Sequence, residues 1–223
     1  MLISIIIPVY NEEKNIRDFM ESLKGIQGDH EVIFVDGGST DNTFNIVKEE
    51  FFIVKSLKSG RGCQMNYGST FAKGEVLMFL HSDSKVPVNL LKSVEDALKK
   101  GKAGCFRIRF DSKSILMKIC AFMSNTRVKI RNIAFGDQGI FITKKYFAEI
   151  GSYPEISIME DYQLSMNIKK DESKIILADA EILTLERRFL KHGRLKTMVV
   201  MQVLQHMYRR GESVERIEEI YNG

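Results

Sequence analysis

Three polar side chains follow directly after apolar runs in the first half of the chain: Asn11, Asp36 and Asp83. The runs are rich in Ile, Val, Leu and Phe, the composition of strands that are buried on both faces. The carboxyl ends of parallel strands meet at one edge of a sheet, and ligands bind there in open α/β sheets. We therefore expect these three side chains to surround one binding site.

Asp36 is followed by Gly37, Gly38 and Ser39. Glycines let a backbone approach a ligand closely, and the Asp36 carboxylate can accept hydrogen bonds from a pyrimidine imide or a ribose hydroxyl. The alternative is a plain strand-to-helix turn in which Ser39 or Asp41 caps the helix. The glycine pattern of dinucleotide-binding folds and the phosphate-binding loop with its lysine are both absent.

Asp83 closes the tetrad Leu80–Asp83 at the end of another apolar run. A carboxylate in this position can hold Mg²⁺ or Mn²⁺ together with phosphate oxygens. The ion would then act as a Lewis acid for a departing diphosphate. Strand-end aspartates are more often turn or cap residues, so the metal hypothesis depends on Asp36 lying at the same edge of the sheet.

Strands and helices alternate through the first hundred residues. The patterns predict strands at 2–9, 31–35, 51–56 and 76–80, and helices at 12–24, 41–49, 62–73 and 89–100. This order indicates an α/β domain with a mostly parallel central sheet and helices on both faces. The second half is less regular, with strands expected at 104–110, 139–143 and 175–178, and helices at 112–124, 158–169, 195–208 and 214–221.

The composition indicates one globular domain. Hydrophobic residues make up 44% of the 223 residues and charged residues 28%, and no Pro- or Ser-rich stretch marks a linker. The net charge of +4 is mild, and no basic stripe with interleaved aromatics is evident, which argues against nucleic-acid binding. Three cysteines without a CxxC pair argue against a disulfide framework and favour a reducing cytoplasm.

Several motifs occur in the order and spacing of glycosyltransferase family 2, which the chain resembles. They are Ser4–Glu12, Val35–Thr43, the strand that ends at Asp83, Gly136–Gly139 and Met159–Asp161. The run Gly60–Asn66 and the tetrad Leu80–Asp83 are similar to a bacterial branch named as radical-SAM- and selenodomain-associated transferases. The resemblance implies a single GT-A domain with a nucleotide-binding half (1–110), an acceptor and catalytic half (111–190) and C-terminal helices (191–223).

The resemblance also implies the reaction: transfer of a sugar, with inversion, from a nucleotide-diphospho-sugar to an acceptor hydroxyl, with a UDP-sugar favoured. Arg187–Phe189 resembles a basic-aromatic segment that closes over the donor in relatives, although a solvated surface pair is the alternative. The implied donor-binding residues are Pro8, Tyr10, Glu12, Asp36, Arg61, Ser82 and Arg188.

The family carries an Asp-x-Asp metal motif, and Asp83 matches its last acidic residue. His81 occupies the first position, where the family usually has a carboxylate. An imidazole nitrogen can bind a metal but lacks the negative charge of a carboxylate. The implied cofactor is Mn²⁺ or Mg²⁺, held by Asp83 and His81.

Glu160 and Asp161 match the acidic pair of the family, in which Asp161 would be the general base for the acceptor hydroxyl. The alternative is that two acidic residues simply favour the dipole at a helix N-terminus. Asp137 and Gln138 would shape the acceptor side of the site, or else form a turn.

Two other functions compete with sugar transfer. A nucleotidyltransferase would carry a glycine-rich, lysine-bearing loop after its first strand, but residues 9–13 contain no glycine. A non-catalytic module that only binds nucleotide-sugars would tolerate the loss of Asp161, whereas a glycosyltransferase would not.

Residues 113–131 and 195–208 combine apolar side chains at helical spacing with basic ones. Such segments form core or an oligomer contact, or they lie on a membrane surface and present a lipid-linked acceptor. We favour core. The protein is expected to be cytoplasmic, with peripheral contact at the inner face of the membrane as the less favoured alternative. The acceptor is unknown; a lipid-linked acceptor and a homodimer both stay open.

Overall fold

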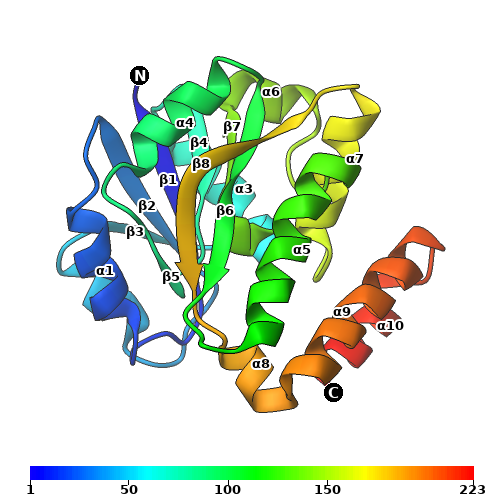
Figure 1. Cartoon of the computed structure of the whole chain (residues 1–223). Helices are drawn as coiled ribbons and strands as arrows, with labels where there is room; N and C mark the ends of the chain where they lie inside the picture. The colour runs from blue at the N-terminus through cyan, green and yellow to red at the C-terminus, as the bar shows by residue number, and fades with distance from the viewer.

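The computed structural model describes residues 1–223 and contains one eight-stranded sheet in the order β3-β2-β1-β4-β7-β6-β8-β5 (Figure 1). The strands are β1 (Ile3–Val9), β2 (His30–Asp36), β3 (Phe52–Lys55), β4 (Val76–Phe79), β5 (Ser84–Lys85), β6 (Ala103–Phe110), β7 (Ile140–Thr143) and β8 (Ile175–Thr184). The pairs β2–β3, β1–β2 and β1–β4 are parallel, as the alternating pattern predicted. Beyond β4 the sheet is mixed, because β7 runs antiparallel to both of its neighbours and β5 runs antiparallel to β8.

Helices cover both faces of the sheet, as predicted. They are α1 (Ile16–Lys24), α2 (Thr43–Lys48), α3 (Arg61–Phe71), α4 (Leu90–Leu98), α5 (Ile115–Arg131), α6 (Lys144–Glu149), α7 (Glu160–Lys170), α8 (Arg187–His192), α9 (Arg194–Arg209) and α10 (Val214–Asn222). One core of 24 buried residues packs α1, α2 and α4 on one face. A second core of 19 packs α3, α6 and α7 on the other.

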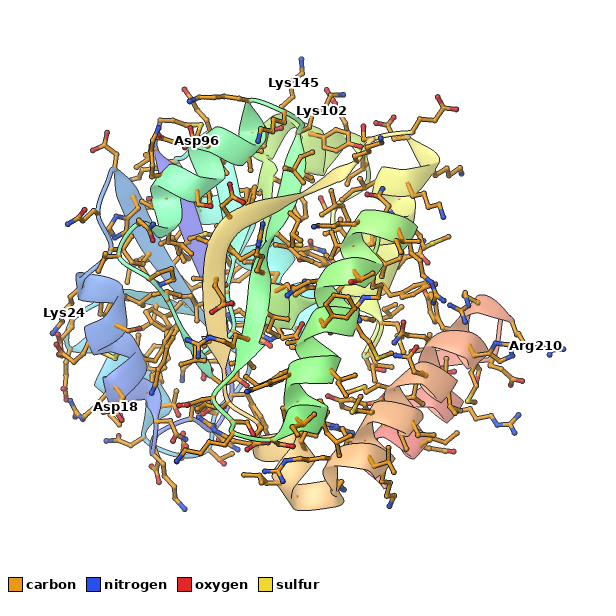
Figure 2. The ribbon with its side chains drawn as sticks, viewed as in Figure 1. Asp18, Lys24, Asp96, Lys102, Lys145 and Arg210 are labelled. Atoms are coloured by element: carbon orange, nitrogen blue, oxygen red, sulfur yellow. The ribbon has the colours of Figure 1, made fainter.

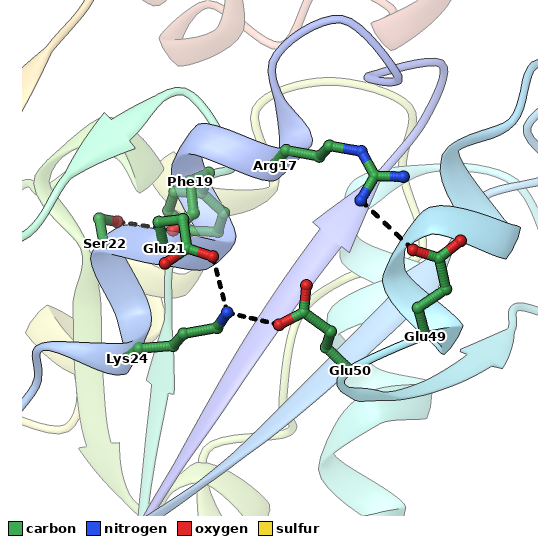
Figure 3. Close-up of polar contacts among 7 residues, drawn as sticks. All are labelled: Arg17, Phe19, Glu21, Ser22, Lys24, Glu49 and Glu50. Carbon is green, nitrogen blue, oxygen red and sulfur yellow. Dashed lines mark hydrogen bonds and ion pairs between the residues drawn. The ribbon is translucent and has the colours of Figure 1, made fainter.

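Helix α1 shows how the sequence pattern becomes packing. Its apolar residues recur at helical spacing and are buried: Ile16, Phe19, Met20 and Leu23. Its polar face is joined to the two residues that follow α2 by ion pairs, from Arg17 to Glu49 at 3.3 Å and from Lys24 to Glu50 at 2.5 Å (Figure 3). Pairs this exposed contribute little stability, so the buried stripe holds α1 in place.

The predicted elements differ from the observed ones mainly in the second half. Helix α5 continues to Arg131 instead of ending near residue 124, and β8 continues to Thr184 instead of ending at residue 178. Strand β5 and helices α6 and α8 were not predicted, because segments of two to six residues are too short to show a period. No helix is both long and apolar enough to cross a bilayer.

The expectation that the apolar residues of 113–131 form core is wrong. Ile115 and Phe122 of α5 are 74% and 72% exposed, and Leu116, Ile119 and Met123 are exposed as well. Only the opposite side of α5, which includes Met117 and Val128, is buried against the domain. Helix α9 fits the expectation better, since Leu204 of its apolar stripe is buried and Met201 and Met207 pack against the same cluster. Leu195, Val199 and Val203 lie on the other side of α9 and are exposed. Helical spacing reveals an apolar face but cannot say whether that face meets protein.

Candidate active site

A cavity of about 830 Å³ lies between α5, α9 and the loops that carry the charged motifs. Its walls on the side of α5 and α9 are mostly apolar, and its other end is charged. The charged end gathers side chains from five separate parts of the chain: Arg61, His81, Asp83, Asp137, Glu160, Asp161, Arg187 and Arg188. The fold thus places most of the predicted catalytic, metal and acceptor-side residues, with two of the donor-binding arginines, around one space.

The acidic pair stands at the start of α7. Met159, directly before the helix, has a left-handed backbone with φ 70°, which turns the chain sharply into the first helical turn. Glu160 and Asp161 follow and are only 1% and 5% exposed. The helix dipole favours carboxylates at this end, as the structural alternative supposed. The dipole does not explain why both carboxylates face a cavity.

The two oxygens of Asp161 have different environments. Oδ2 accepts a hydrogen bond from the backbone N–H of Gly136 at 2.8 Å. Oδ1 is buried without a hydrogen bond of ordinary geometry, and the hydroxyl of Tyr153 lies beside this carboxylate. Burial, followed by the negative charge of Glu160, raises the pKa of Asp161 to about 7, against the opposing charge of Arg61. A carboxylate with a free oxygen and a pKa near neutrality has the properties of a general base.

Glu160 is paired with Arg61, whose Nε lies 3.0 Å from its Oε1. Arg61 begins α3, and Gly62 beside it allows α3 to approach the segment that leads to α7. A Cβ on Gly62 would lie 2.6 Å from the carbonyl oxygen of Pro154. The close approach therefore fixes a positive charge beside the acidic pair.

Gly136 lies between His81, which follows β4, and Asp161, which is in the first turn of α7. A Cβ at this position would lie 2.4 Å from Nε2 of His81 and 2.7 Å from Oδ2 of Asp161. No side chain fits there without displacing one of them. The glycine therefore sets the spacing between the predicted metal ligand and the predicted base.

His81 and Asp83 each keep one buried polar atom without a partner, Nε2 and Oδ1 respectively. Burial and the charge of Arg61 lower the pKa of His81 to about 3, so its imidazole is neutral. Burial raises the pKa of Asp83. A neutral imidazole nitrogen and a carboxylate oxygen are suitable metal ligands. No group of three or more His, Cys, Asp or Glu side chains has metal-binding geometry, so a bound ion would need further ligands from substrate or water.

The two predicted acceptor-side residues, Asp137 and Gln138, differ in whether they face the cavity. Asp137 lines the cavity, its Oδ1 has no partner, and burial raises its pKa. Gln138 is fully buried and lies outside the lining: its amide oxygen accepts from Arg127 at 3.0 Å, and its nitrogen donates to the carbonyl of Phe106 at 3.4 Å. Gln138 thus holds Arg127 and the β6 backbone together rather than facing the cavity.

Asp36 lies at the end of β2 but outside the lining of the cavity. Its side chain is 1% exposed and accepts hydrogen bonds from the backbone N–H groups of Gly38 and Ser39 at 3.1–3.2 Å. Asn11 ties the neighbouring loop to this turn by accepting from the N–H of Thr40 at 2.8 Å. The Asp36 carboxylate therefore shapes the β2–α2 turn, and its contact with a donor stays a prediction.

The other predicted donor-binding residues, Pro8, Tyr10, Glu12 and Ser82, also lie outside the cavity lining. Tyr10 is 58% exposed at the end of β1. Glu12 reaches the site indirectly, because it pairs at 3.3 Å with Arg187, which does line the cavity. Arg187 itself was not among the predicted site residues, although it begins the basic-aromatic segment noted in the sequence.

Comparison with known proteins shows similarity to glycosyltransferases in both sequence and structure. The family model described as glycosyl transferase family 2 matches residues 4–149. A putative glycosyltransferase of Bacillus subtilis, CsbB, is 32% identical over 111 residues, which cover 45% of this chain and 34% of that protein.

Two solved structures share the fold at lower identity. Staphylococcus aureus TarS 1–349 in complex with UDP-GlcNAc aligns with a TM-score of 0.66 at 19% identity, over 84% of this chain and 59% of that one. The mannosyltransferase PcManGT of Pyrobaculum calidifontis in complex with GDP-Man and Mn²⁺ aligns with a TM-score of 0.71 at 16% identity, over 93% and 63%. The chain thus spans less than two thirds of the length of each of these three proteins.

Proposed function

The chain belongs to glycosyl transferase family 2, and we propose that it transfers a sugar from a nucleotide-diphospho-sugar to an acceptor hydroxyl with inversion, using Asp161 as the general base. The observation that carries the proposal is the state of Asp161. Its carboxylate is buried at the cavity, one oxygen is held by Gly136, the other is free, and its pKa is about 7.

In the proposed reaction, the acceptor oxygen bonds to the anomeric carbon while its proton passes to the free oxygen of Asp161. The bond between the anomeric carbon and the diphosphate oxygen breaks on the opposite face of the sugar. The nucleoside diphosphate leaves with the electron pair of that bond, and the anomeric configuration is inverted. Gly136 keeps the carboxylate oriented during this transfer, since its N–H binds only Oδ2.

Three arginines at the charged end support a diphosphate leaving group. Arg61, Arg187 and Arg188 all line the cavity. Guanidinium groups bind diphosphate oxygens through parallel hydrogen bonds and offset the negative charge that develops on departure. We propose UDP as the nucleotide, which the TarS complex with UDP-GlcNAc supports; the PcManGT complex with GDP-Man makes GDP the competitor to be tested.

Asp83, helped by His81, is the proposed holder of Mn²⁺ or Mg²⁺. The free Oδ1 of Asp83 and the free Nε2 of the neutral His81 support this assignment, and the Mn²⁺ complex of PcManGT supports the choice of ion. When bound, the ion would neutralise charge on the leaving diphosphate. Because His81 carries no negative charge, we expect weaker ion binding than a pair of carboxylates would give.

The test separates donor binding from transfer. Calorimetry with UDP, GDP and dTDP, each with and without Mn²⁺ or Mg²⁺, identifies the nucleotide and the ion. Asp161→Asn should bind the same nucleotide with unchanged affinity but lower the transfer rate by about 10²- to 10⁴-fold. Asp18→Asn, on the exposed face of α1, is the matched control and should leave both unchanged. Full activity in Asp161→Asn would show that another group is the base, and no binding of any nucleotide would overturn the donor site.

A further inference from the structure

One face of the molecule differs sharply in charge from the rest. We define the basic face as residues 113–131 and 187–210, which contain α5, α8 and α9. These two segments hold twelve of the 33 basic residues and none of the 29 acidic residues. The remainder of the chain therefore has 21 basic residues against 29 acidic ones. The mild net charge of the whole protein hides this division.

Most cations of the basic face are also unpaired; the exceptions with a carboxylate within 4.0 Å are Arg187 and Arg194. Elsewhere, eleven of the 21 lysines and arginines lie within 4.0 Å of a carboxylate, as Arg17 and Lys24 do on α1 (Figure 3). On the basic face, eight exposed cations have no carboxylate within 4.0 Å: Lys113, Lys118, Lys129, Arg131, Lys191, Lys196, Arg209 and Arg210. Arg210 lies at the outer end of α9 and points away from the sheet (Figure 2).

The same face exposes apolar side chains. Of the 17 large hydrophobic residues exposed in the protein, ten belong to the basic face. Those from α5 are Ile115, Leu116, Ile119, Phe122, Met123 and Ile130, and those from α8 and α9 are Leu190, Leu195, Val199 and Val203. Helices α5, α8 and α9 lie together, with α9 in contact with both α5 and α8 (Figure 1). Apolar clusters of this extent on a protein surface mark an interaction site.

We infer that the basic face binds the surface of a bilayer that contains anionic lipids. Helices that combine exposed apolar residues with lysine and arginine lie in the interfacial region, where the apolar groups enter the acyl boundary and the cations contact lipid phosphates. The inference does not depend on the reaction proposed for the active site.

Charge distinguishes this partner from a second copy of the chain. A two-fold dimer through the basic face would place unpaired cations of one copy against those of the other, with no carboxylate in either segment to neutralise them. A nucleic acid would satisfy the charge but would leave residues such as Phe122 and Ile115 against phosphates and water. An anionic bilayer satisfies both the cations and the apolar side chains.

The position of the cavity agrees with a basic face that lies on the bilayer. Six of the exposed apolar residues of the basic face also line the active-site cavity, three from α5 and three from α9: Phe122, Met123, Ile130, Leu195, Val199 and Val203. The cavity therefore opens on the face that would rest on the membrane. An acceptor anchored in the bilayer would enter the cavity directly from that face.

The test is co-sedimentation of the full chain with vesicles of phosphatidylcholine, alone or with about one third phosphatidylglycerol. We expect binding to the anionic vesicles that weakens with added salt, and little binding to the neutral ones. Two double variants probe the two contributions and avoid the cavity: Ile115→Ser with Leu190→Ser, and Lys118→Glu with Lys191→Glu. Each should lower the partition coefficient by about tenfold or more.

Matched controls lie elsewhere on the surface. Leu57→Ser with Val88→Ser removes side chains that are 83% and 56% exposed, and Lys48→Glu with Lys170→Glu changes the net charge by the same amount as the basic-face pair. Both controls should bind as the unmodified protein does. The inference is overturned if anionic vesicles are not bound at low salt, or if the controls lose as much binding as the basic-face variants. It is also overturned if the protein does not bind vesicles and the basic-face variants instead dissociate a dimer or abolish binding to an oligonucleotide.

Discussion

Asp36 and Asp161 are both buried aspartates at the end of an element, yet their surroundings differ. Both oxygens of Asp36 accept hydrogen bonds from the turn that follows it, so its charge is used in folding that turn. Asp161 keeps one oxygen free beside a second buried carboxylate, so its charge is poorly compensated and its pKa rises to about 7. A buried carboxylate whose hydrogen bonds are satisfied supports structure, whereas one that is left unsatisfied at a cavity is available for chemistry.

The largest change that we expect is the fall in transfer rate at low pH. Asp161 acts as a base only when ionised, and a pKa of about 7 means that it takes up a proton as the pH falls through neutrality. We expect the rate to fall about tenfold for each pH unit below 7, and about 100-fold by pH 5, with a plateau above pH 8. Initial rates measured at saturating donor would give this profile, with thermal unfolding at each pH to confirm that the protein is folded. A flat profile between pH 5 and 8 would assign the chemistry to another group.

Gly136→Ala should lower the transfer rate by about tenfold or more, because its Cβ would push His81 or Asp161 out of position. Gly25→Ala is the control, since the nearest atoms to a Cβ there lie at ordinary contact distances of 3.7 and 3.8 Å. The same kinetic assay compares the two variants. If Gly136→Ala is as active as Gly25→Ala, then the spacing between His81 and Asp161 is unimportant for catalysis.

Asp36→Ala should lower the free energy of unfolding by about 1–2 kcal/mol, because two backbone N–H groups lose a charged acceptor. The melting temperature should fall by about 2–4 °C for each kcal/mol. Asp36→Asn retains an acceptor oxygen and should recover most of this loss. Donor affinity, measured on the stable Asn variant, separates a role of Asp36 in the turn from a role in donor binding. A raised Kd would show that Asp36 also contacts the donor.

Asp161→Asn should change stability in the opposite direction, raising the melting temperature above pH 7 by about 2–4 °C for each kcal/mol of ionisation cost that it removes. Since burial raises the pKa of Asp161 above its ordinary value of 3.8, ionisation destabilises the folded protein progressively from about pH 4 to pH 7. The asparagine avoids this cost, so its advantage should shrink as the pH falls towards 4. Melting curves at pH 8 and pH 5 test the prediction, and a variant less stable than the original protein at pH 8 would contradict it.

The sequence predicted the long elements of the first half well, because their apolar runs are continuous and separated by clear turns. It also identified seven of the eight residues at the charged end of the cavity, Arg187 being the exception. It failed on Gln138, whose partners on α5 and β6 come together only in the folded chain. It failed again on α5, where an apolar stripe was interpreted as core. Periodicity is a property of one helix, whereas burial depends on whether another element covers it.

The hydrogen atom that serves as the side chain of Gly136 also limits how this site can change by mutation. Every codon one nucleotide away from a glycine codon, apart from synonymous and stop codons, encodes a residue that has a Cβ. Each of those residues would meet His81 and Asp161 at less than 3 Å. No single-nucleotide change at codon 136 can therefore introduce a side chain without a clash at His81 and Asp161. A different side chain at position 136 would first require a change at His81 or in the loop before α7.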